Sequence, residues 1–216
     1  MPTGGLAGLF VSSLITFFVV IDPPGCAPIY AGLTAGVERT HVRAMAVRAV
    51  LVAAAILFVF ALFGQDILSA LGISLDSFRI AGGIMLFLIA LEMVFEKRTE
   101  RREERAEEIQ RRHAEAHREE PEDISVFPMG IPMIAGPGSI ATVMLVTSRN
   151  HGVHLMIVLA ALAAVLLATL ISLLAAGAIM RVLGDKLEAM ITRILGVLLA
   201  ALAAQYVIDG VKASFS

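Results

Sequence analysis

The chain has 216 residues, of which 58% are hydrophobic and 17% charged, and its mean hydropathy is +0.85. A water-soluble domain is typically about 45–50% apolar and about 25% charged, so this composition argues against one. The single cysteine excludes an intrachain disulfide, and the net charge of −2 gives no electrostatic basis for binding nucleic acid. The glycine patterns of nucleotide-binding loops and the Cys/His spacing of zinc sites are absent, so we expect no cofactor and no metal.

Six apolar segments are long enough, or nearly long enough, to cross a bilayer as helices. A hydrocarbon core about 30 Å thick requires roughly 20 apolar residues of α-helix. Strands of a membrane barrel would instead alternate polar and apolar residues over about ten positions. The sequence therefore predicts an all-α, polytopic membrane protein with six transmembrane helices, at residues 6–34, 44–64, 78–95, 126–147, 153–180 and 190–209.

Basic residues are distributed unevenly among the loops that connect these segments. Fourteen Lys and Arg fall in the first, third and fifth loops, whereas three fall on the other side: Arg79, Arg149 and Lys212. Because cytoplasmic loops carry the excess of basic residues, we expect both termini to lie outside the cytoplasm. We expect the first segment to be retained rather than cleaved as a signal peptide, since no Lys or Arg precedes it and Asp22 to Pro24 replace a cleavage site.

The stretch from Glu96 to Asp123 holds 8 of the 17 basic and 11 of the 19 acidic residues. Glu/Arg pairs at i,i+4 and good helix formers predict a solvated cytoplasmic helix and linker over residues 96–121. A helix that binds a partner protein is the alternative. His113 and His117 share a helix face, but no third ligand lies near them, so metal binding there is disfavoured.

Two pairs of landmarks recur along the chain at nearly the same spacing. Gly25 lies in a Pro-Pro-Gly interruption of the first segment, and Gly138 lies in a Gly-Pro-Gly interruption of the fourth, 113 residues later. The motifs that begin at Arg79 and Arg193 are 114 residues apart. The spacing predicts two three-helix repeats with opposite orientations in the membrane, an organisation found in many secondary transporters. The predicted division is into residues 1–95, the charged linker 96–121, and residues 122–216.

The interruptions predict that the first and fourth helices are broken. Proline removes an N–H and clashes with the preceding turn, and glycine permits backbone geometry that other residues resist. An unpaired backbone group costs several kcal/mol in lipid, so a break must be buried in protein or line a watery cavity. The N–H groups of helices restarting at Gly25 and Gly138 would suit a carboxylate. We predict substrate-binding residues at these breaks near the bilayer midplane: Asp22, Pro24, Gly25, Cys26, Gly136, Gly138, Ser139 and Thr142.

Asp22 is the one acidic residue that precedes a break deep in an apolar segment, and its counterpart in the second half is Ala135. A carboxylate inside the membrane is a functional candidate, here for a proton, Na⁺ or a substrate ammonium group. The alternative, compatible with the first, is that Asp22 caps the following half-helix. Glu92, Gln205 and Tyr206 are candidates for a gate, because Glu92 and Tyr206 occupy matching places in the two repeats.

Several motifs, taken in chain order, resemble the MarC family of bacterial and archaeal inner-membrane proteins. They lie at residues 22–28, 63–64, 71–74, 78–84 and 127–140. The resemblance implies a six-span protein of the inner membrane, and some members of the family are linked to transport of small neutral amino acids such as glycine and alanine. This chain departs from the family pattern at Pro24, where relatives more often have an aliphatic residue, and in its longer charged linker.

These features predict a secondary transporter of a small polar solute, with small neutral amino acids favoured, that works by alternating access. The alternatives are a passive channel, an exporter of another small solute, and a membrane scaffold that transports nothing. An enzyme is disfavoured because no Ser/His or Cys/His pair falls within the apolar segments. The expected partners are the lipid bilayer, the solute and a coupling H⁺ or Na⁺. The oligomeric state and the direction of transport stay open.

Overall fold

The computed structural model describes residues 5–95 and 123–215. These residues form the helical segments α1 (Gly5–Ile21), α2 (Pro23–Leu33), α3 (Arg39–Ala70), α4 (Leu75–Val94), η1 (Ser125–Ile134), α6 (Pro137–Thr147), α7 (Val153–Leu174) and α8 (Ala176–Ser214). No strand occurs in the described residues, so the predicted all-helical fold class is confirmed. The predicted charged helix over 96–121, with His113 and His117, lies outside them.

The helices have the length and surface of a membrane protein. Five stretches are long and apolar enough to cross a bilayer, or six if η1 and α6 together count as one bent span. Large apolar side chains face outward, as on α3, where Leu51 is 62% and Phe63 55% exposed. An apolar outer surface of this kind indicates contact with lipid. The inverted repeat and the division of the chain into three parts stay predictions.

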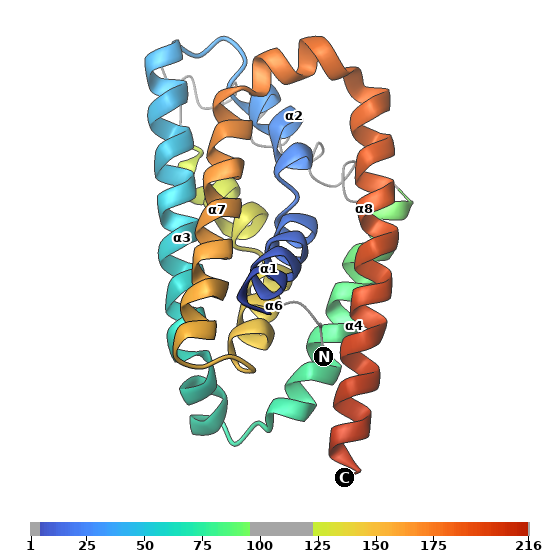
Figure 1. Ribbon diagram of the computed structural model, residues 1–216. Helices are drawn as coiled ribbons and strands as arrows, with labels where there is room; N and C mark the ends of the chain where they lie inside the picture. The colour runs from blue at the N-terminus through green and yellow to red at the C-terminus, as the bar shows by residue number, and fades with distance from the viewer. Residues whose placement is uncertain (1–4, 96–122, 216) are drawn as a thin grey trace.

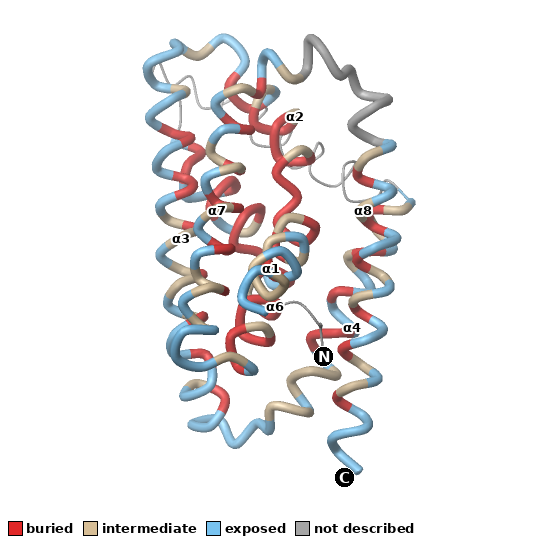
Figure 2. Tube along the Cα trace, viewed as in Figure 1, coloured by how far each residue is buried: buried red, intermediate tan, exposed pale blue. Residues whose placement is uncertain are grey.

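Three groups of helices make up the molecule. Figure 1 shows α3 and α7 on one side, α4 and α8 on the other, and α1, α2 and α6 between them. α4 packs mainly on α8, whereas α1 packs on α7 and α2 packs on both α7 and α8. Buried residues concentrate on the central helices, around the junctions of α1 with α2 and of η1 with α6 (Figure 2).

Glycines allow α4 and α8 to approach each other closely. A Cβ atom at Gly83 would lie 2.9 Å from the carbonyl oxygen of Ala203, and one at Gly196 would lie 2.9 Å from the Cβ of Met93. A larger side chain at either position would therefore push the helices apart. Small residues at helix contacts are typical of membrane proteins, in which close backbone packing replaces the hydrophobic effect as the driving force.

The junction between the last two helices differs from the prediction. The predicted fifth span continued to residue 180, whereas α7 ends at Leu174 and α8 begins at Ala176. The N–H groups of Ala178 and Ile179 both bond to the carbonyl of Ala175, each at 2.8 Å, which starts the new helix. Hydropathy does not detect this turn because the residues around it are small and apolar. Within α8, the part that qualifies as a span is Met190–Ser214.

Candidate functional site

The helix is interrupted between α1 and α2 at Asp22. This residue has the left-handed conformation (φ 57°, ψ 63°), which is uncommon for a residue other than glycine. α1 ends because Pro23 has no N–H to donate to the preceding turn and its ring would clash with that turn. Proline is well suited to the first position of the next helix, since its fixed φ matches the helix and its missing N–H would have no partner there.

The carboxylate of Asp22 caps α2. The N–H of Gly25 donates to Asp22 Oδ1 at 3.2 Å, and the N–H of Cys26 donates to the carbonyl oxygen of Asp22 at 3.1 Å. Pro23 and Pro24 have no N–H, so the first turn of α2 offers no free donor to a ligand. The expectation that the Gly25 N–H is free to bind a substrate carboxylate is therefore wrong. The alternative, in which Asp22 caps the half-helix, describes the observed hydrogen bond. A Cβ at Gly25 would lie 2.2 Å from Asp22 Oδ2, so glycine is required for this contact.

A residue of α7 completes the first break. The hydroxyl of Ser172 donates to the carbonyl oxygen of Pro23 at 2.8 Å, and the Ser172 side chain is buried. The sequence reading missed Ser172 because it lies inside an apolar segment without any motif around it. The available signal was the position itself, since a buried serine in a span must place its hydroxyl on a hydrogen-bond partner.

The second break lies between η1 and α6, which are bent by 54° relative to each other. Phe127 and Ile131 have extended backbones (φ −130°) because each precedes a proline, which disfavours the helical conformation at the residue before it. A Cβ at Gly136 would lie 2.4 Å from the carbonyl oxygen of Pro132, so only glycine fits at this turn. α6 then begins at Pro137, again with proline in the first position.

The N-terminus of α6 differs from that of α2 because no side chain caps it. Ile140 donates its N–H to the carbonyl of Gly136 at 3.0 Å, but the N–H groups of Gly138 and Ser139 donate to no residue in the described part of the chain. The hydroxyl of Thr142 is fully buried and likewise has no hydrogen-bond partner among those residues. Because helical side chains tilt toward the N-terminus, the Thr142 side chain lies over the turn that contains Gly138.

The two breaks are neighbours in space. A Cβ at Gly138 would lie 2.5 Å from Ile89 Cδ1 and 3.8 Å from Cγ1 of Val20, two residues before Asp22. One buried apolar cluster also includes residues from both breaks, among them Ile21, Cys26, Ile134 and Ala135. The predicted site residues are therefore brought into one region, where Pro24 is half-buried and the others are buried. The packing around Gly138 is close and apolar.

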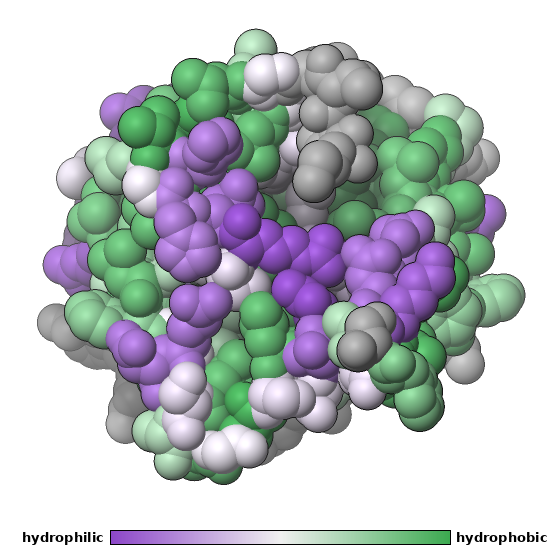
Figure 3. All heavy atoms as spheres, turned by 60° about the horizontal axis from the view of Figure 1, so that its bottom comes forward, coloured by the Kyte–Doolittle hydropathy of each residue, from purple (hydrophilic) through white to green (hydrophobic). Residues whose placement is uncertain are grey.

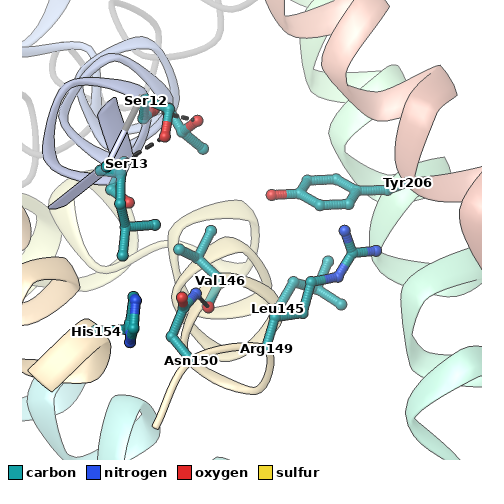
Figure 4. Close-up of a pocket in the computed structure, with 11 residues that line it drawn as sticks. Ser12, Ser13, Leu145, Val146, Arg149, Asn150, His154 and Tyr206 are labelled. Atoms are coloured by element: carbon teal, nitrogen blue, oxygen red, sulfur yellow. Dashed lines mark hydrogen bonds between the residues drawn. The ribbon is translucent and has the colours of Figure 1, made fainter. Parts of the chain in front are cut away.

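A cavity of about 820 Å³ lies between α1, the end of α6 and α8 (Figure 4). We call it the Arg149 cavity; its lining comes from α1, α6, α7, α8 and the turn after α6: Gly5, Leu9, Ser12, Ser13, Thr16, Leu145, Val146, Arg149, Asn150, His154 and Tyr206. Thr16 is six residues from Asp22, and Leu145 is seven residues from Gly138. At 1.5 Å of helix rise per residue, the cavity ends about 10 Å from both breaks.

An apolar layer separates the Arg149 cavity from the breaks. Leu145 is fully buried and belongs to a cluster with Val20 of α1 and Leu86 of α4, the residues that also surround Gly138. The same cluster includes Tyr206, so it reaches the wall of the cavity. We call the trio of Val20, Leu86 and Leu145 the apolar layer. Leu145 thus lines the cavity, while Val20 and Leu86 of the same layer lie against Gly138 at the uncapped end of α6.

Polar groups from the turn after α6 and from α8 meet at the wall of the Arg149 cavity. Arg149 forms an ion pair with Asp209 (Nη2 to Oδ2, 3.1 Å), and its guanidinium carbon lies 5.9 Å from the centre of the Tyr206 ring. The amide of Gln205 donates to the other carboxylate oxygen of Asp209 at 2.7 Å. The sequence analysis named Gln205 and Tyr206 as gate candidates but assigned no role at a site to Arg149 or Asp209.

The three gate candidates do not form one group. α4 and α8 are antiparallel, and Val207 packs against Gly83, so Tyr206 lies near the level of Gly83. Glu92 is nine residues further along α4, or about 14 Å away along the helix axis. Gln205 and Tyr206 therefore lie at the end of the molecule that carries the cavity, whereas Glu92 lies toward the other end. Hydrophilic residues gather across the cavity end, and apolar residues cover the flanks (Figure 3).

Apolar spanning helices, an apolar outer surface and polar breaks buried between helices together define a polytopic integral membrane protein. The family model described as "MarC family integral membrane protein" matches residues 7–215. The chain therefore belongs to the MarC family, as the motifs indicated.

Curated relatives cover nearly the whole chain. The UPF0056 membrane protein MJ1677 of Methanocaldococcus jannaschii is 34% identical over 205 residues, which is 94% of this chain and 96% of the relative. The UPF0056 membrane protein YvbG of Bacillus subtilis is 35% identical, with 95% of each chain covered. The UPF0056 inner membrane protein YhgN of Escherichia coli is 31% identical, over 94% of this chain and 95% of the relative. No solved structure matches the chain.

Proposed function

We propose that this protein is a secondary transporter for a small zwitterionic solute, with small neutral amino acids such as glycine and alanine as the favoured substrates. The observation that carries the proposal is the uncapped N-terminus of α6. There the Gly138 and Ser139 N–H groups and the Thr142 hydroxyl are buried without a hydrogen-bond partner among the described residues. Buried polar groups are nearly always hydrogen-bonded, so three at one helix end indicate a place for a ligand.

The charges around the two breaks suit a zwitterion. The N-terminus of α6 carries a partial positive charge and N–H donors, which favour a carboxylate. Asp22, at the neighbouring break, supplies a negative charge for an ammonium group or for a coupling H⁺ or Na⁺. The N-terminus of α2 does not compete for the solute carboxylate, because Asp22 already occupies it. The proposed site thus has one end for each charge of the substrate.

The close packing around the site favours a small substrate. A single methyl group at Gly138 would already lie 2.5 Å from Ile89 Cδ1, so a bound solute must displace apolar side chains or enter when they move apart. Alternating access supplies such a movement. In the proposal, the structure is a closed conformation with the Arg149 cavity open on one side and the apolar layer shut. The proposal takes the two breaks as parts of inverted repeats, and the excess of basic residues in the first, third and fifth loops supports an orientation with the cavity and both termini outside the cytoplasm.

Uptake of radiolabelled glycine and alanine into proteoliposomes, under imposed H⁺ and Na⁺ gradients, tests the proposal. Thr142→Val keeps the side-chain shape and removes the hydroxyl, and we expect it to raise KM about tenfold. Thr169→Val is the matched control, because the Thr169 hydroxyl is equally buried but bonds to the carbonyl of Val165 in its own helix at 2.9 Å. Normal uptake by Thr142→Val, or an equal loss in both variants, would contradict the assignment.

Asp22→Asn separates the charge of Asp22 from its capping role. Asparagine is as good an N-cap as aspartate, so the variant keeps the bond from Gly25 and loses the negative charge. We expect a folded protein whose uptake no longer responds to the coupling gradient. Full uptake with unchanged ion dependence would show that Asp22 only caps α2.

Accumulation of solute against its gradient by the wild type would exclude a passive channel, and the lack of any flux would favour a scaffold.

A further inference from the structure

The Arg149 cavity has the size of a ligand-binding pocket and lies apart from the proposed central site. Its volume of about 820 Å³ falls in the range of about 300–1,000 Å³ that is usual for ligand pockets. Figure 4 shows Tyr206 and Arg149 on one side, with the Tyr206 hydroxyl directed toward α1, and Ser12 and Ser13 on the opposite side. The two walls differ in the hydrogen-bonding groups that they present.

The α1 wall presents acceptors. The Ser12 hydroxyl donates to the carbonyl of Leu9 at 3.1 Å, and the Thr16 hydroxyl donates to the carbonyl of Ser12 at 2.8 Å. A hydroxyl has one donor hydrogen and two acceptor lone pairs, so these oxygens remain able to accept from a ligand. Ser12, Ser13 and Thr16 lie on adjacent turns, and all three line the cavity. Such a wall suits an ammonium group.

The opposite wall presents donors. A guanidinium has five N–H donors, and Arg149 uses one terminal nitrogen for its bond to Asp209. Its side chain is 38% exposed, and the ring of Tyr206 beside it holds the guanidinium in place. Arginine binds carboxylates through paired N–H···O bonds, which makes it a common group at carboxylate sites. Both carboxylate oxygens of Asp209 have partners, since Oδ2 pairs with Arg149 and Oδ1 accepts from Gln205.

We infer that the Arg149 cavity is a second binding site, which takes the carboxylate of an amino acid on Arg149 and its ammonium group on the hydroxyls of α1. This inference rests on the proposed function, because the cavity would deliver the solute to the proposed central site at the breaks. Gly138, Thr142, Leu145 and Arg149 follow one another at spacings of four, three and four residues, so they lie along one face of α6 and its continuation. A carboxylate would pass from Arg149 to the uncapped helix end over about 16 Å, with the apolar layer between the two sites.

Equilibrium binding of radiolabelled alanine to the full chain in lipid nanodiscs tests the inference. We expect two classes of site in the wild type, one of which loses at least tenfold in affinity in Arg149→Gln and is partly restored in Arg149→Lys. Propionate, which keeps the carboxylate, should compete at this site, whereas ethylamine at the same concentration should compete less.

Asp209→Asn is the matched control because it breaks the same ion pair and leaves the charge of Arg149 in place. We expect alanine to bind this variant as tightly as the wild type or more tightly, since Arg149 is released from a competing carboxylate. Equal losses in Arg149→Gln and Asp209→Asn would overturn the inference and show that the ion pair is structural. A single class of site that Thr142→Val removes and Arg149→Gln leaves unchanged would also overturn it, while the proposed central site would stand. Absence of uptake in proteoliposomes would refute the proposed transporter. The binding of alanine in nanodiscs, and its loss in Arg149→Gln, would still decide whether the Arg149 cavity is a binding site.

Discussion

Ser172 and Pro23 are 149 residues apart in the chain, and the hydroxyl of Ser172 donates to the carbonyl oxygen of Pro23 at 2.8 Å. The carbonyl belongs to the first turn after the Asp22 break, where the chain leaves one helix and starts another. The bond therefore ties α7 to the place where α1 gives way to α2. It explains how a break with unusual backbone geometry keeps one conformation inside a membrane.

Ser172→Ala should destabilise this break. The variant leaves a buried carbonyl without its partner, and such a loss typically costs about 1–3 kcal/mol. We expect a lower thermal unfolding midpoint in detergent and faster amide hydrogen exchange at Gly25 and Cys26. Ser172→Thr retains the hydroxyl and should restore most of the stability. A midpoint and exchange rates equal to those of the wild type would mean that α7 does not hold the break.

Gly25→Ala should disrupt the cap of α2. The added Cβ would lie 2.2 Å from Asp22 Oδ2, so the carboxylate must move away from the helix end. We expect a loss on the scale of a missing N-cap, about 0.5–2 kcal/mol, measured by thermal unfolding. Gly32→Ala is the control in the same helix, since no atom lies within 4 Å of the added Cβ and alanine favours helix. Equal stability of the two variants would contradict the capping role.

Leu145→Ala should open the apolar layer. The reporter is Cys26, which is the one cysteine of the chain, lies in the first turn of α2 and is fully buried. We expect a small water-soluble thiol reagent to modify Cys26 at least tenfold faster in this variant. Leu199→Ala is the control, because Leu199 is equally buried in the same cluster as Leu145 but belongs neither to the apolar layer nor to the lining of the Arg149 cavity. Equal acceleration in both variants would indicate general loosening rather than an opened path.

Asp123 should make stability depend on pH in acid. The hydroxyl and N–H of Ser125, together with Arg48 at 2.7 Å, lower the pKa of Asp123 below its ordinary value, despite an opposing effect of burial. A lowered pKa contributes stability above the unfolded value of about 3.9, and that stability is lost as the pH falls through the folded value. The pair is exposed, so we expect less than about 1 kcal/mol. Thermal unfolding of wild type and Asp123→Asn should converge once the pH falls below the folded pKa of Asp123, and parallel curves throughout would contradict this.

The sequence indicated where proline and glycine would interrupt a helix, but it did not show the hydrogen bonds that form there. Proline lacks an N–H in any fold, which disfavours it inside a helix and suits Pro23 and Pro137 to the first position of one, although Pro28 lies inside α2. The left-handed backbone of Asp22 determines whether the carboxylate reaches Gly25, and no local pattern shows that conformation in advance. The sequence placed an acidic residue before only one of the two half-helices, and this conformation is what makes that residue the cap of α2, whereas α6 has no side-chain cap.

The sequence alone determined that this is a helical membrane protein with apolar segments long enough to cross a bilayer, and its motifs indicated the family to which it belongs. These properties follow from the lengths of the apolar segments and from local motifs. Each segment must satisfy its own backbone hydrogen bonds in lipid, so its helical structure does not depend on how the segments pack together. The tertiary structure decided which polar groups stay without partners, that Ser172 holds the carbonyl of Pro23, and that Arg149 meets Asp209 beside a cavity. Such contacts join residues far apart in the chain, so they depend on how the helices pack rather than on the composition of any one of them.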